Sequence, residues 1–281
     1  MASLTLPGTN LVRISVVMPS LNQGRYLRRA LESVFGQQGP FEIDLVVIDG
    51  GSLDGSLGIL AEYTERLRLV SGPDQGQVDA IQRGLAMCRG DVVGWLNSDD
   101  ALLPGAFRRI AEAFQWRPDW DWVHGRCRIV NEDDREVQRW ISRYKHARCL
   151  RHSFDALLLE NYISQMTVYW RRGLLETIGP LDAEVPLAFD YDLWLRLAEH
   201  SDPGYIVEPQ AAFRRHPESK TGRGYVEMFQ QEYRVAQQHA AGRRRTLWRK
   251  RLRTMAFTLA YHALDQGRRL RLSVAHPCVG R

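Results

Sequence analysis

The sequence predicts an α/β protein with a mostly parallel central sheet, flanked by helices and followed by a helical C-terminal extension. Short apolar, β-branched runs alternate with segments of helical periodicity through residues 13–100. After about residue 222 the pattern becomes helical and strongly basic. At 281 residues the chain is long enough to bury a large core, and its hydrophobic content of 44% is ordinary for a globular protein.

Four buried strands are expected in the N-terminal part, at 13–20, 43–51, 67–76 and 91–96. Each is a short apolar run that ends at small or polar residues, which is typical of strands covered on both faces. Apolar residues at helical spacing fill the intervals, at Leu27, Leu31, Val34 and Phe35, at Leu57, Leu60 and Leu67, and at Val78, Ile81 and Leu85. Because strand–helix–strand crossovers produce parallel pairs, this order predicts a parallel sheet.

The elements expected after residue 100 are less regular. Pro104 opens a helix at a first-turn position and places Phe107 on the inner face of that helix. Residues 120–141 are expected to form a hairpin of two strands around a polar turn at 131–134. The remaining elements are a helix near 153–161, a strand at 165–171, a helix at 189–200, a helical stretch at 225–242 and a basic segment from Arg243.

Composition argues against several classes of protein. No apolar run approaches the roughly 18–20 residues of a membrane span, and no basic segment precedes the first apolar residues as in a signal peptide. The four cysteines form no CxxC pair, so neither a zinc site nor a disulfide framework is expected, and a cytoplasmic location fits best. The net charge of +5 arises in residues 241–281, which hold eleven Lys and Arg against one acid. A nucleic-acid partner is therefore not expected.

Small and polar residues follow each of the four predicted strands. These segments are 19–22, 49–52, 72–76 and 97–100, and three of them contain Asp. Asp, Asn, Ser and Gly also collect in ordinary turns and helix caps, which would explain any one of the segments. Because ligands of open parallel sheets bind beyond the carboxyl ends of the strands, the four together predict a ligand cleft.

The chemistry of this cleft points to a divalent cation. The sequence has no GxGxxG after the first strand and no GxxxxGK[ST], so neither a dinucleotide site nor a P-loop is expected. Carboxylates rather than lysines follow the strands, and Mg²⁺ and Mn²⁺ favour oxygen ligands together with substrate phosphates. We therefore expect Mn²⁺ or Mg²⁺ to mediate phosphate binding.

Five motifs carry a resemblance to a known family. PSLNQGRYL, VVIDGGSLDG, PDQGQVDAIQRGL, GWLNSDD and AFDYDLWLRL occur in this order over about residues 12–220. The series resembles the bacterial family 2 glycosyltransferases, which are inverting enzymes of the GT-A fold that use nucleotide-diphosphate sugars and usually need Mn²⁺ or Mg²⁺. The resemblance implies a catalytic domain at 1–222, with a nucleotide-sugar half at about 12–100 and an acceptor half at about 101–222. Residues 223–281 form a basic helical extension outside it.

The resemblance implies donor contacts at the strand ends. Asp49 would accept a hydrogen bond from the nucleobase or ribose, although it could instead cap a helix. Gly76 could equally be a turn glycine. The other residues implied to line the nucleotide and donor-sugar pocket are Pro19, Ser20, Asn22, Asp74, Asn97 and Ser98.

Asp99 occupies the position of the second Asp of the family's DxD metal motif, where Asn97 replaces the first. An amide oxygen ligates a cation more weakly than a carboxylate, so Asp99 is the expected direct ligand. Asp100 is expected to cap or orient the helix that Pro104 opens. His216 matches a family histidine that can reach the metal or diphosphate, although a lone His is more often structural. Arg214 and Arg215 could neutralise a diphosphate or simply be solvated.

The motif AFDYDLWLRL holds the expected general base. Asp190 matches the family's catalytic base, and Asp192 is the second candidate because Phe189 stands where many relatives have Glu. Both could instead serve only to complement the helix dipole. Gln165 is expected under the acceptor in relatives.

The basic tail admits two interpretations. Trp248, Leu252, Met255 and Leu259 recur at helical spacing beside several arginines. Such a helix can lie on an anionic membrane, which would place the protein at the inner face of the plasma membrane. It can equally pack its apolar face on the catalytic domain, and the two arrangements are compatible.

The sequence therefore predicts an inverting, hexosyltransferase-type glycosyltransferase. It would move a sugar from a nucleotide-diphosphate donor, with UDP-sugars favoured, to a hydroxyl of a glycan or lipid-linked acceptor in cell-surface polysaccharide biosynthesis. Two alternatives stay open at this point: a sugar-phosphate nucleotidyltransferase, for which 19–27 lacks the Gly-rich basic loop, and a non-catalytic nucleotide-sugar-binding module.

Overall fold

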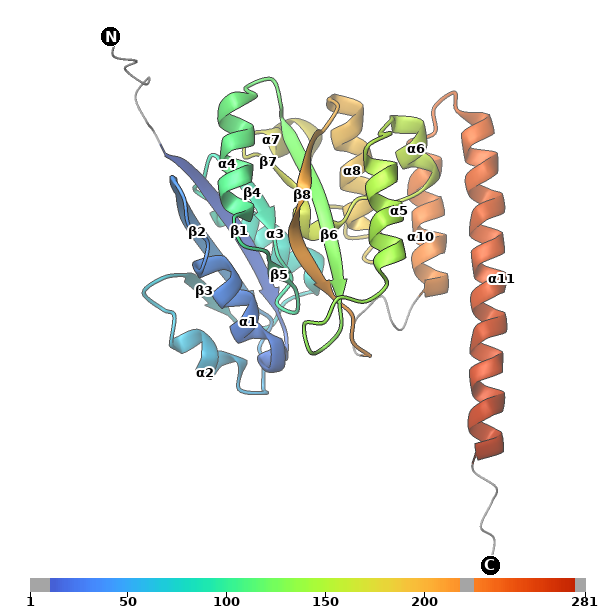
Figure 1. Ribbon diagram of the computed structural model, residues 1–281, viewed down its shortest axis with the longest axis horizontal. Coiled ribbons are helices and arrows are strands. Elements are labelled where there is room, and N and C mark those ends of the chain that lie inside the picture. Colours follow the sequence, from blue (N-terminus) through green and yellow to red (C-terminus); the bar gives the residue numbers. More distant parts are fainter. Residues whose placement is uncertain (1–10, 218–224, 276–281) are drawn as a thin grey trace, which may run out of the picture.

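The computed structural model describes residues 11–217 and 225–275 of the chain, with side chains described as far as residue 259. An eight-stranded sheet crosses the molecule in the order β3-β2-β1-β4-β7-β6-β8-β5, and helices cover both of its faces (Figure 1). The strands are β1 (Val12–Ser20), β2 (Phe41–Asp49), β3 (Arg68–Ser71), β4 (Val92–Trp95), β5 (Ala101–Leu102), β6 (Trp122–Val130), β7 (Tyr169–Arg171) and β8 (Gly204–Arg214).

The parallel half of the sheet follows the sequence prediction. β1 pairs in parallel with β2 and β4, and β2 pairs in parallel with β3. The connecting helices are α1 (Gly24–Phe35), α2 (Ser56–Ala61) and α3 (Gln77–Met87). Seven consecutive residues of β1, from Ile14 to Ser20, are buried, as expected for a central strand covered on both faces.

The second half of the sheet is mixed. β7 lies antiparallel between β4 and β6, β6 pairs in parallel with β8, and β8 pairs antiparallel with β5. The helices of this half are α4 (Ala106–Trp116), α5 (Arg139–Cys149), α6 (Phe154–Leu159), α7 (Leu174–Ile178) and α8 (Phe189–His200). The predicted strand at 165–171 is a 3-10 turn, Gln165–Thr167, followed by the short strand β7.

The predicted hairpin at 120–141 is wrong. Its first strand exists as β6, but the return segment makes only the bridge Val130–Glu136 before α5 begins at Arg139. The physical reason is that the return segment turns into α5, which packs on β6 instead of pairing along its edge; β7 occupies that edge only at Trp122 and Val123.

Two hydrophobic cores lie on opposite faces of the sheet. One contains Leu27, Leu31, Ile110 and Phe107, contributed by α1 and α4. The other contains Trp95, which stacks on Trp194 with ring centroids 5.5 Å apart and also packs edge-on against Trp170. This second core surrounds α8, so the helix that carries the expected base is held rigidly.

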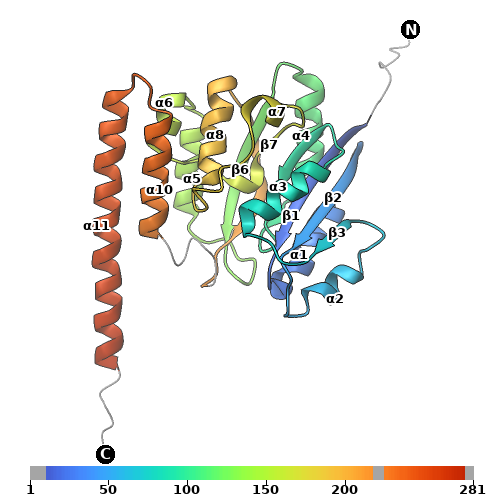
Figure 2. The same cartoon turned by 180° about the vertical axis from the view of Figure 1, so that it is seen from behind.

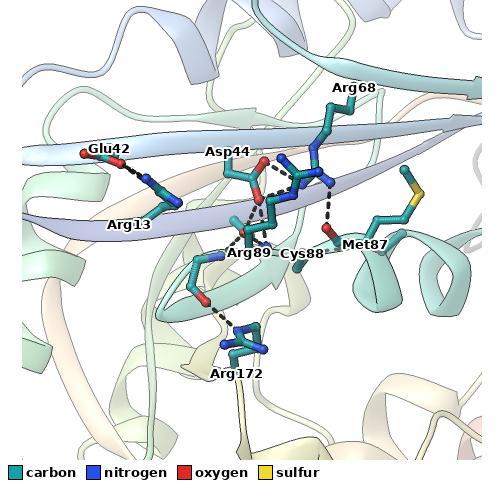
Figure 3. Close-up of polar contacts among 11 residues, drawn as sticks. Arg13, Glu42, Asp44, Arg68, Met87, Cys88, Arg89 and Arg172 are labelled. Atoms are coloured by element: carbon teal, nitrogen blue, oxygen red, sulfur yellow. Dashed lines mark hydrogen bonds and ion pairs between the residues drawn. The ribbon is translucent and has the colours of Figure 1, made fainter.

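A polar network joins the strands at the edge of the sheet remote from the predicted cleft (Figure 3). The Asp44 carboxylate of β2 accepts hydrogen bonds from Ser15 Oγ of β1 and from the Arg68 guanidinium of β3. It also accepts one from the Arg89 backbone N–H, while Arg172 donates to the Gly90 carbonyl oxygen. These contacts connect β1, β2 and β3 with the segments that precede β4 and follow β7.

Two helices complete the described chain, α10 (Tyr225–Gln238) and α11 (Arg244–Ala275). α10 packs on α8, and α11 packs on α10 and α6. Both views show α10 and α11 side by side, far from α2 and β3, with α11 continuing beyond the end of α10 (Figures 1 and 2). A search of the described helices finds none that is long and apolar enough to cross a membrane.

Candidate active site

A cavity of about 440 Å³ opens at the carboxyl ends of β1 and β4. The walls come from the loops after these strands, from α3 and α8, and from Met228 of α10. Eight of the residues expected from the sequence line it together: Pro19, Ser20, Asp74, Gly76, Asn97, Ser98, Asp99 and Asp190. The structure thus brings the predicted donor, metal and base residues to one site.

Hydrogen-bonding groups at the donor end of the cavity are available to a ligand. The Ser20 hydroxyl and the Trp95 indole N–H are buried and have no hydrogen-bond partner among the described residues. Buried polar groups are normally paired, so these two are suited to binding polar atoms of a ligand. The Asp74 carboxylate accepts from the Gly76 backbone N–H at 2.8 Å, and Gly76 has the positive φ of 104° that glycine tolerates best.

Asn22 and Asp49 do not line the cavity; they order the loops behind it. The fully buried Asp49 carboxylate accepts hydrogen bonds from the backbone of Gly51 and Ser52 and from the hydroxyls of Ser52 and Ser71. Asn22 Oδ1 accepts from the Leu53 backbone N–H at 2.8 Å. Both side chains therefore tie the loops after β1 and β2 together, and the expected contact of Asp49 with a nucleobase or ribose has no open oxygen to use in this arrangement.

Asn97 is a junction between the two halves of the sheet. Its Oδ1 accepts from Gln77 Nε2 of α3 at 2.8 Å, and its Nδ2 donates to Gln165 Oε1 at 3.3 Å and to Asp100 Oδ2 at 3.4 Å. Gln165 in turn donates to the Trp95 carbonyl oxygen at 2.7 Å. The amide oxygen of Asn97 is thus already engaged in a hydrogen bond within the protein.

Asp99 and His216 lie against each other across two loops. Asp99 Oδ2 is 3.0 Å from His216 Nε2, and the two side chains are 20% and 1% exposed. The His216 ring also packs on the Tyr26 ring, with centroids 4.8 Å apart. An oxygen and an imidazole nitrogen together suit Mn²⁺-type ions, so the pair expected from the sequence fits a cation.

These two residues cannot complete a metal site by themselves. Within 11–217 and 225–275, no group of three or more His, Cys, Asp or Glu side chains is placed to hold a metal ion. The remaining ligands would have to come from a diphosphate and water, as is common for Mg²⁺.

Asp100 does not cap the helix after Pro104, and that prediction is wrong. The N-cap residue of α4 is Gly105, and no side chain caps the helix from that position. Asp100 points inward instead, where its Oδ1 accepts from the Arg214 backbone N–H at 2.9 Å. Burial and the neighbouring Asp99 carboxylate raise the pKa of Asp100 well above its ordinary value.

Arg214 does not contribute a free cation for a diphosphate. Its guanidinium is buried, donating to the carbonyl oxygens of Asp99, Asn131 and Glu132 and forming an ion pair with Asp134 at 2.7 Å. The side chain therefore fixes the loop of Asp99 to the turn after β6. The Arg215 side chain is exposed.

Asp190 has the geometry and pKa of a general base. It stands in the first turn of α8, lines the cavity, and accepts from the Tyr191 backbone N–H at 2.7 Å. Burial, with a smaller contribution from Glu232, raises the pKa of Asp190 from 3.8 to about 6. A carboxylate with such a pKa is ionised at neutral pH and still basic enough to accept a proton.

Asp192 does not fit the role of base that the sequence left open for it. It is buried away from the cavity, paired with Arg196 at 2.7 Å and with His239 at 3.0 Å. Although burial alone raises the pKa of Asp192, the hydrogen bonds from His239 and the charge of Arg196 outweigh that effect and lower it. Asp192 therefore joins α8 to α10.

No residue of the C-terminal helices was among the site residues expected from the sequence. Gln231 Oε1 of α10 accepts from the Leu187 backbone N–H at 2.8 Å, just before α8. Lys250 of α11 is 2% exposed, and its Nζ lies 3.2 Å from Glu232 and 3.4 Å from the Tyr191 hydroxyl. The signal available in the sequence was a lysine, Lys250, beside an apolar helical stripe, because a lysine that becomes buried there needs a buried partner of opposite charge.

Comparisons of the sequence with known protein families are consistent with the geometry of this site. The family model described as Glycosyl transferase family 2 matches residues 15–176. A PGL/p-HBAD biosynthesis glycosyltransferase of Mycobacterium bovis (strain BCG / Pasteur 1173P2) is 30% identical over 199 residues, covering 69% of this chain and 72% of that protein. A glycosyltransferase of Nostoc sp. is 35% identical over 180 residues, covering 61% of this chain and 54% of that one.

Solved structures of similar fold include two transferases. S. aureus TarS 1-349, solved in complex with UDP, has a TM-score of 0.59 at 19% identity, covering 79% of this chain and 65% of that chain. This chain thus spans just under two thirds of the TarS structure. The mannosyltransferase PcManGT from Pyrobaculum calidifontis, in complex with GDP-Man and Mn²⁺, has a TM-score of 0.59 at 20% identity, covering 95% and 81%. At these identities the likeness concerns the fold.

The chain belongs to glycosyl transferase family 2 and has the GT-A type fold. It is a nucleotide-sugar-dependent glycosyltransferase, as the family match and the named relatives show. The nucleotidyltransferase alternative is therefore wrong, and so is that of a non-catalytic binding module.

Proposed function

We propose that this enzyme transfers a hexose with inversion from a nucleotide-diphosphate sugar, UDP-sugars being favoured, to a hydroxyl of a glycan or lipid-linked acceptor in cell-surface polysaccharide synthesis. The observation that carries the proposal is the placement of Asp99 and Asp190 on the wall of one cavity, Asp190 with a raised pKa. Inversion follows if the acceptor oxygen displaces the diphosphate in one step, because a single displacement inverts the configuration of the anomeric carbon.

The donor would bind along the ends of β1 and β4. The Ser20 hydroxyl and Trp95 N–H are open to its polar atoms, and Asp74 stands at the start of α3 on the same wall. Fixing the donor between these groups orients its anomeric carbon toward the base and lowers the entropic part of the barrier.

Asp99 and His216 would hold Mn²⁺ or Mg²⁺ at the diphosphate. When bound, such a cation stabilises negative charge on the departing diphosphate oxygen. The contribution of the chain is to keep the two ligands in place, through the contact of Arg214 Nε with the Asp99 carbonyl oxygen and the contact of Tyr26 with the His216 ring.

Asp190 would accept the proton of the acceptor hydroxyl. The acceptor oxygen forms its bond to the anomeric carbon while the bond from that carbon to the diphosphate oxygen breaks, and the nucleoside diphosphate leaves. The proton stays on the Asp190 carboxylate until it passes to solvent. Phe189 and Leu187 line the same wall and limit the access of water to this carboxylate.

Two measurements test the proposal. A thermal-shift screen of UDP, GDP, dTDP and CDP with Mn²⁺ should show one nucleotide raising the melting temperature, because a bound ligand stabilises the folded chain. Transfer with the matching sugar nucleotide should fall on addition of EDTA and be reduced by about 10²- to 10⁴-fold in Asp190→Asn, the usual range for loss of a general base. Full transfer by Asp190→Asn would show that the base is another group.

A further inference from the structure

We propose that the outer face of α11 binds the surface of an anionic phospholipid bilayer. The outer stripe consists of four apolar side chains, which are exposed by 62%, 45%, 52% and 69% in chain order: Trp248, Leu252, Met255 and Leu259. On a helix that turns 100° per residue, these four fall within a sector of about 60°. They therefore form one continuous apolar line along the helix.

The opposite face of α11 already holds the helix to the protein. Leu247 packs against the core around α8, and Phe257 stacks on Phe229 of α10 with centroids 5.4 Å apart. The buried Lys250 pairs with Glu232, as described above. The expectation that this apolar stripe packs on the catalytic domain is therefore wrong: its four side chains are exposed, and the helix packs on the domain through its other face.

Arginines flank the outer stripe on both sides. By helical position, Arg244 and Arg251 lie along one side, and Arg245 and Arg249 along the other. All four are exposed and form no ion pair within the described chain, whereas Arg253, on the inner side, pairs with Glu160. An apolar line between two rows of long cationic side chains is the pattern of a helix that lies in a membrane interface, with its arginines extended to the lipid phosphates.

Charge decides which partner covers this face. Residues 244–259 contain six Lys and Arg and no acid. A second copy of the chain would bring these arginines against each other, and like charges at close range are repulsive. A nucleic acid would satisfy the arginines but would leave the apolar stripe in water. Anionic lipid headgroups above an apolar interior complement both features.

The position of α11 allows this contact. The helix forms one flank of the molecule in both views and continues past α10, and no other helix or strand of the described residues lies outside it (Figures 1 and 2). A flat surface can therefore reach the whole outer face without moving any part of the domain.

The test is sedimentation of the full-length chain with vesicles. We expect strong binding to vesicles of phosphatidylcholine mixed with phosphatidylglycerol, weak binding to phosphatidylcholine alone, and loss of binding at high salt. Replacing Arg245, Arg249 and Arg251 together by Gln should weaken binding to the mixed vesicles on the order of 100-fold. The matched control replaces three exposed arginines that form no ion pair in the described chain, Arg128, Arg135 and Arg143, and should bind as the unaltered chain does.

The apolar stripe needs its own variant. Leu252→Ser combined with Met255→Ser should also weaken binding to the mixed vesicles, because it removes apolar area from the lipid interior. Trp116→Ser is the control, since Trp116 is 73% exposed on α4, away from α11. Retained donor hydrolysis and an unchanged melting temperature would show that each variant is folded.

Three results would overturn the proposal. Equal binding to both kinds of vesicle would show that charge does not contribute to membrane binding. Unaltered binding by the Leu252→Ser, Met255→Ser variant would show that the apolar stripe does not contribute. Sedimentation equilibrium that shows a dimer lost in that same variant would identify a second copy as the occupant. None of these results depends on the transfer reaction, so they test α11 independently of the proposed function.

Discussion

Replacing Asp190 by Asn should stabilise the folded protein at neutral pH while strongly reducing its activity. Burial raises the pKa of this carboxyl to about 6 in the folded chain, against 3.8 when it is freely solvated. The folded state therefore binds the proton more tightly than the unfolded state. Above about pH 6 both states are ionised, and the folded state bears the full cost of the buried charge.

The size of the effect follows from the two pKa values. A difference of one pKa unit corresponds to 1.36 kcal/mol, so the ionised carboxylate costs the fold at most about 3 kcal/mol. Asn is nearly isosteric and its Oδ1 can still accept from the Tyr191 N–H. We expect Asp190→Asn to raise the free energy of unfolding by about 1–3 kcal/mol near pH 8, with the gain vanishing below about pH 4.

Asp192→Asn is the matched control, because it makes the same chemical change two residues along α8. The pKa of Asp192 is lowered in the folded state, so its contribution to stability is present above about pH 4 and is lost as the pH falls further. Asp192→Asn should therefore destabilise the protein near neutral pH, with its effect shrinking in acid. The two variants should change stability in opposite directions.

Urea unfolding of the three proteins, followed by circular dichroism at several pH values, measures these differences. The kcat/KM of the unaltered enzyme should also fall as the pH drops through about 6, because the base of the free enzyme must be unprotonated. If Asp190→Asn were as stable as the unaltered chain at every pH, the carboxylate would be solvated and our assignment of a buried base would be refuted.

Three further variants probe the supports of the site. Gln231→Ala should lower kcat more than it raises KM for the donor, because it leaves the Leu187 N–H, beside the base helix, without its hydrogen-bond partner. Initial rates at varied concentrations of donor and acceptor substrate measure this. Gln231→Glu keeps the oxygen that accepts the hydrogen bond and should recover part of the loss. Asp44→Ala should cost about 2–4 kcal/mol of stability in urea unfolding at neutral pH, because it leaves buried donors unpaired, while kcat per folded molecule stays unchanged. Lys250→Met should lower the free energy of unfolding by about 3–5 kcal/mol, because it leaves the buried Glu232 carboxylate without its cationic partner. Combining it with Glu232→Gln should restore most of this free energy. If the losses of the two single variants simply added in the double variant, the two side chains would not be coupled.

The sequence was sufficient to predict the parallel half of the sheet because strand and helix patterns alternate there without interruption, and each strand–helix–strand crossover produces a parallel pair. Distance along the chain is not the difference, since β1 with β4 and β6 with β8 both join residues about eighty positions apart. Between β6 and β8 the chain forms the antiparallel strand β7 and several helices, so no repeating pattern predicts which strands pair.

The candidate site divides in a similar way. Ser20, Asp74, Asp99 and Asp190 follow strands or begin a helix, and their place on the cavity wall follows from the topology. The distinction between Asp190 and its neighbour Asp192 could not be made from spacing. It depends on His239, which follows directly after α10 and pairs with Asp192, while Asp190 lines the cavity.

The hydrogen bonds of Asn97 link the two halves of the enzyme, so that a change in one half can affect the other. One amide group contacts Gln77 on the donor side and Gln165 on the acceptor side, within 2.8 and 3.3 Å. A donor that displaced Gln77 would leave this amide free to rotate, and Gln165 would then lose its hydrogen bond from Asn97 while keeping the one it donates to the Trp95 carbonyl oxygen. Binding of the donor before the acceptor would then require no domain movement, because the rotation of a single side chain would couple the two binding sites.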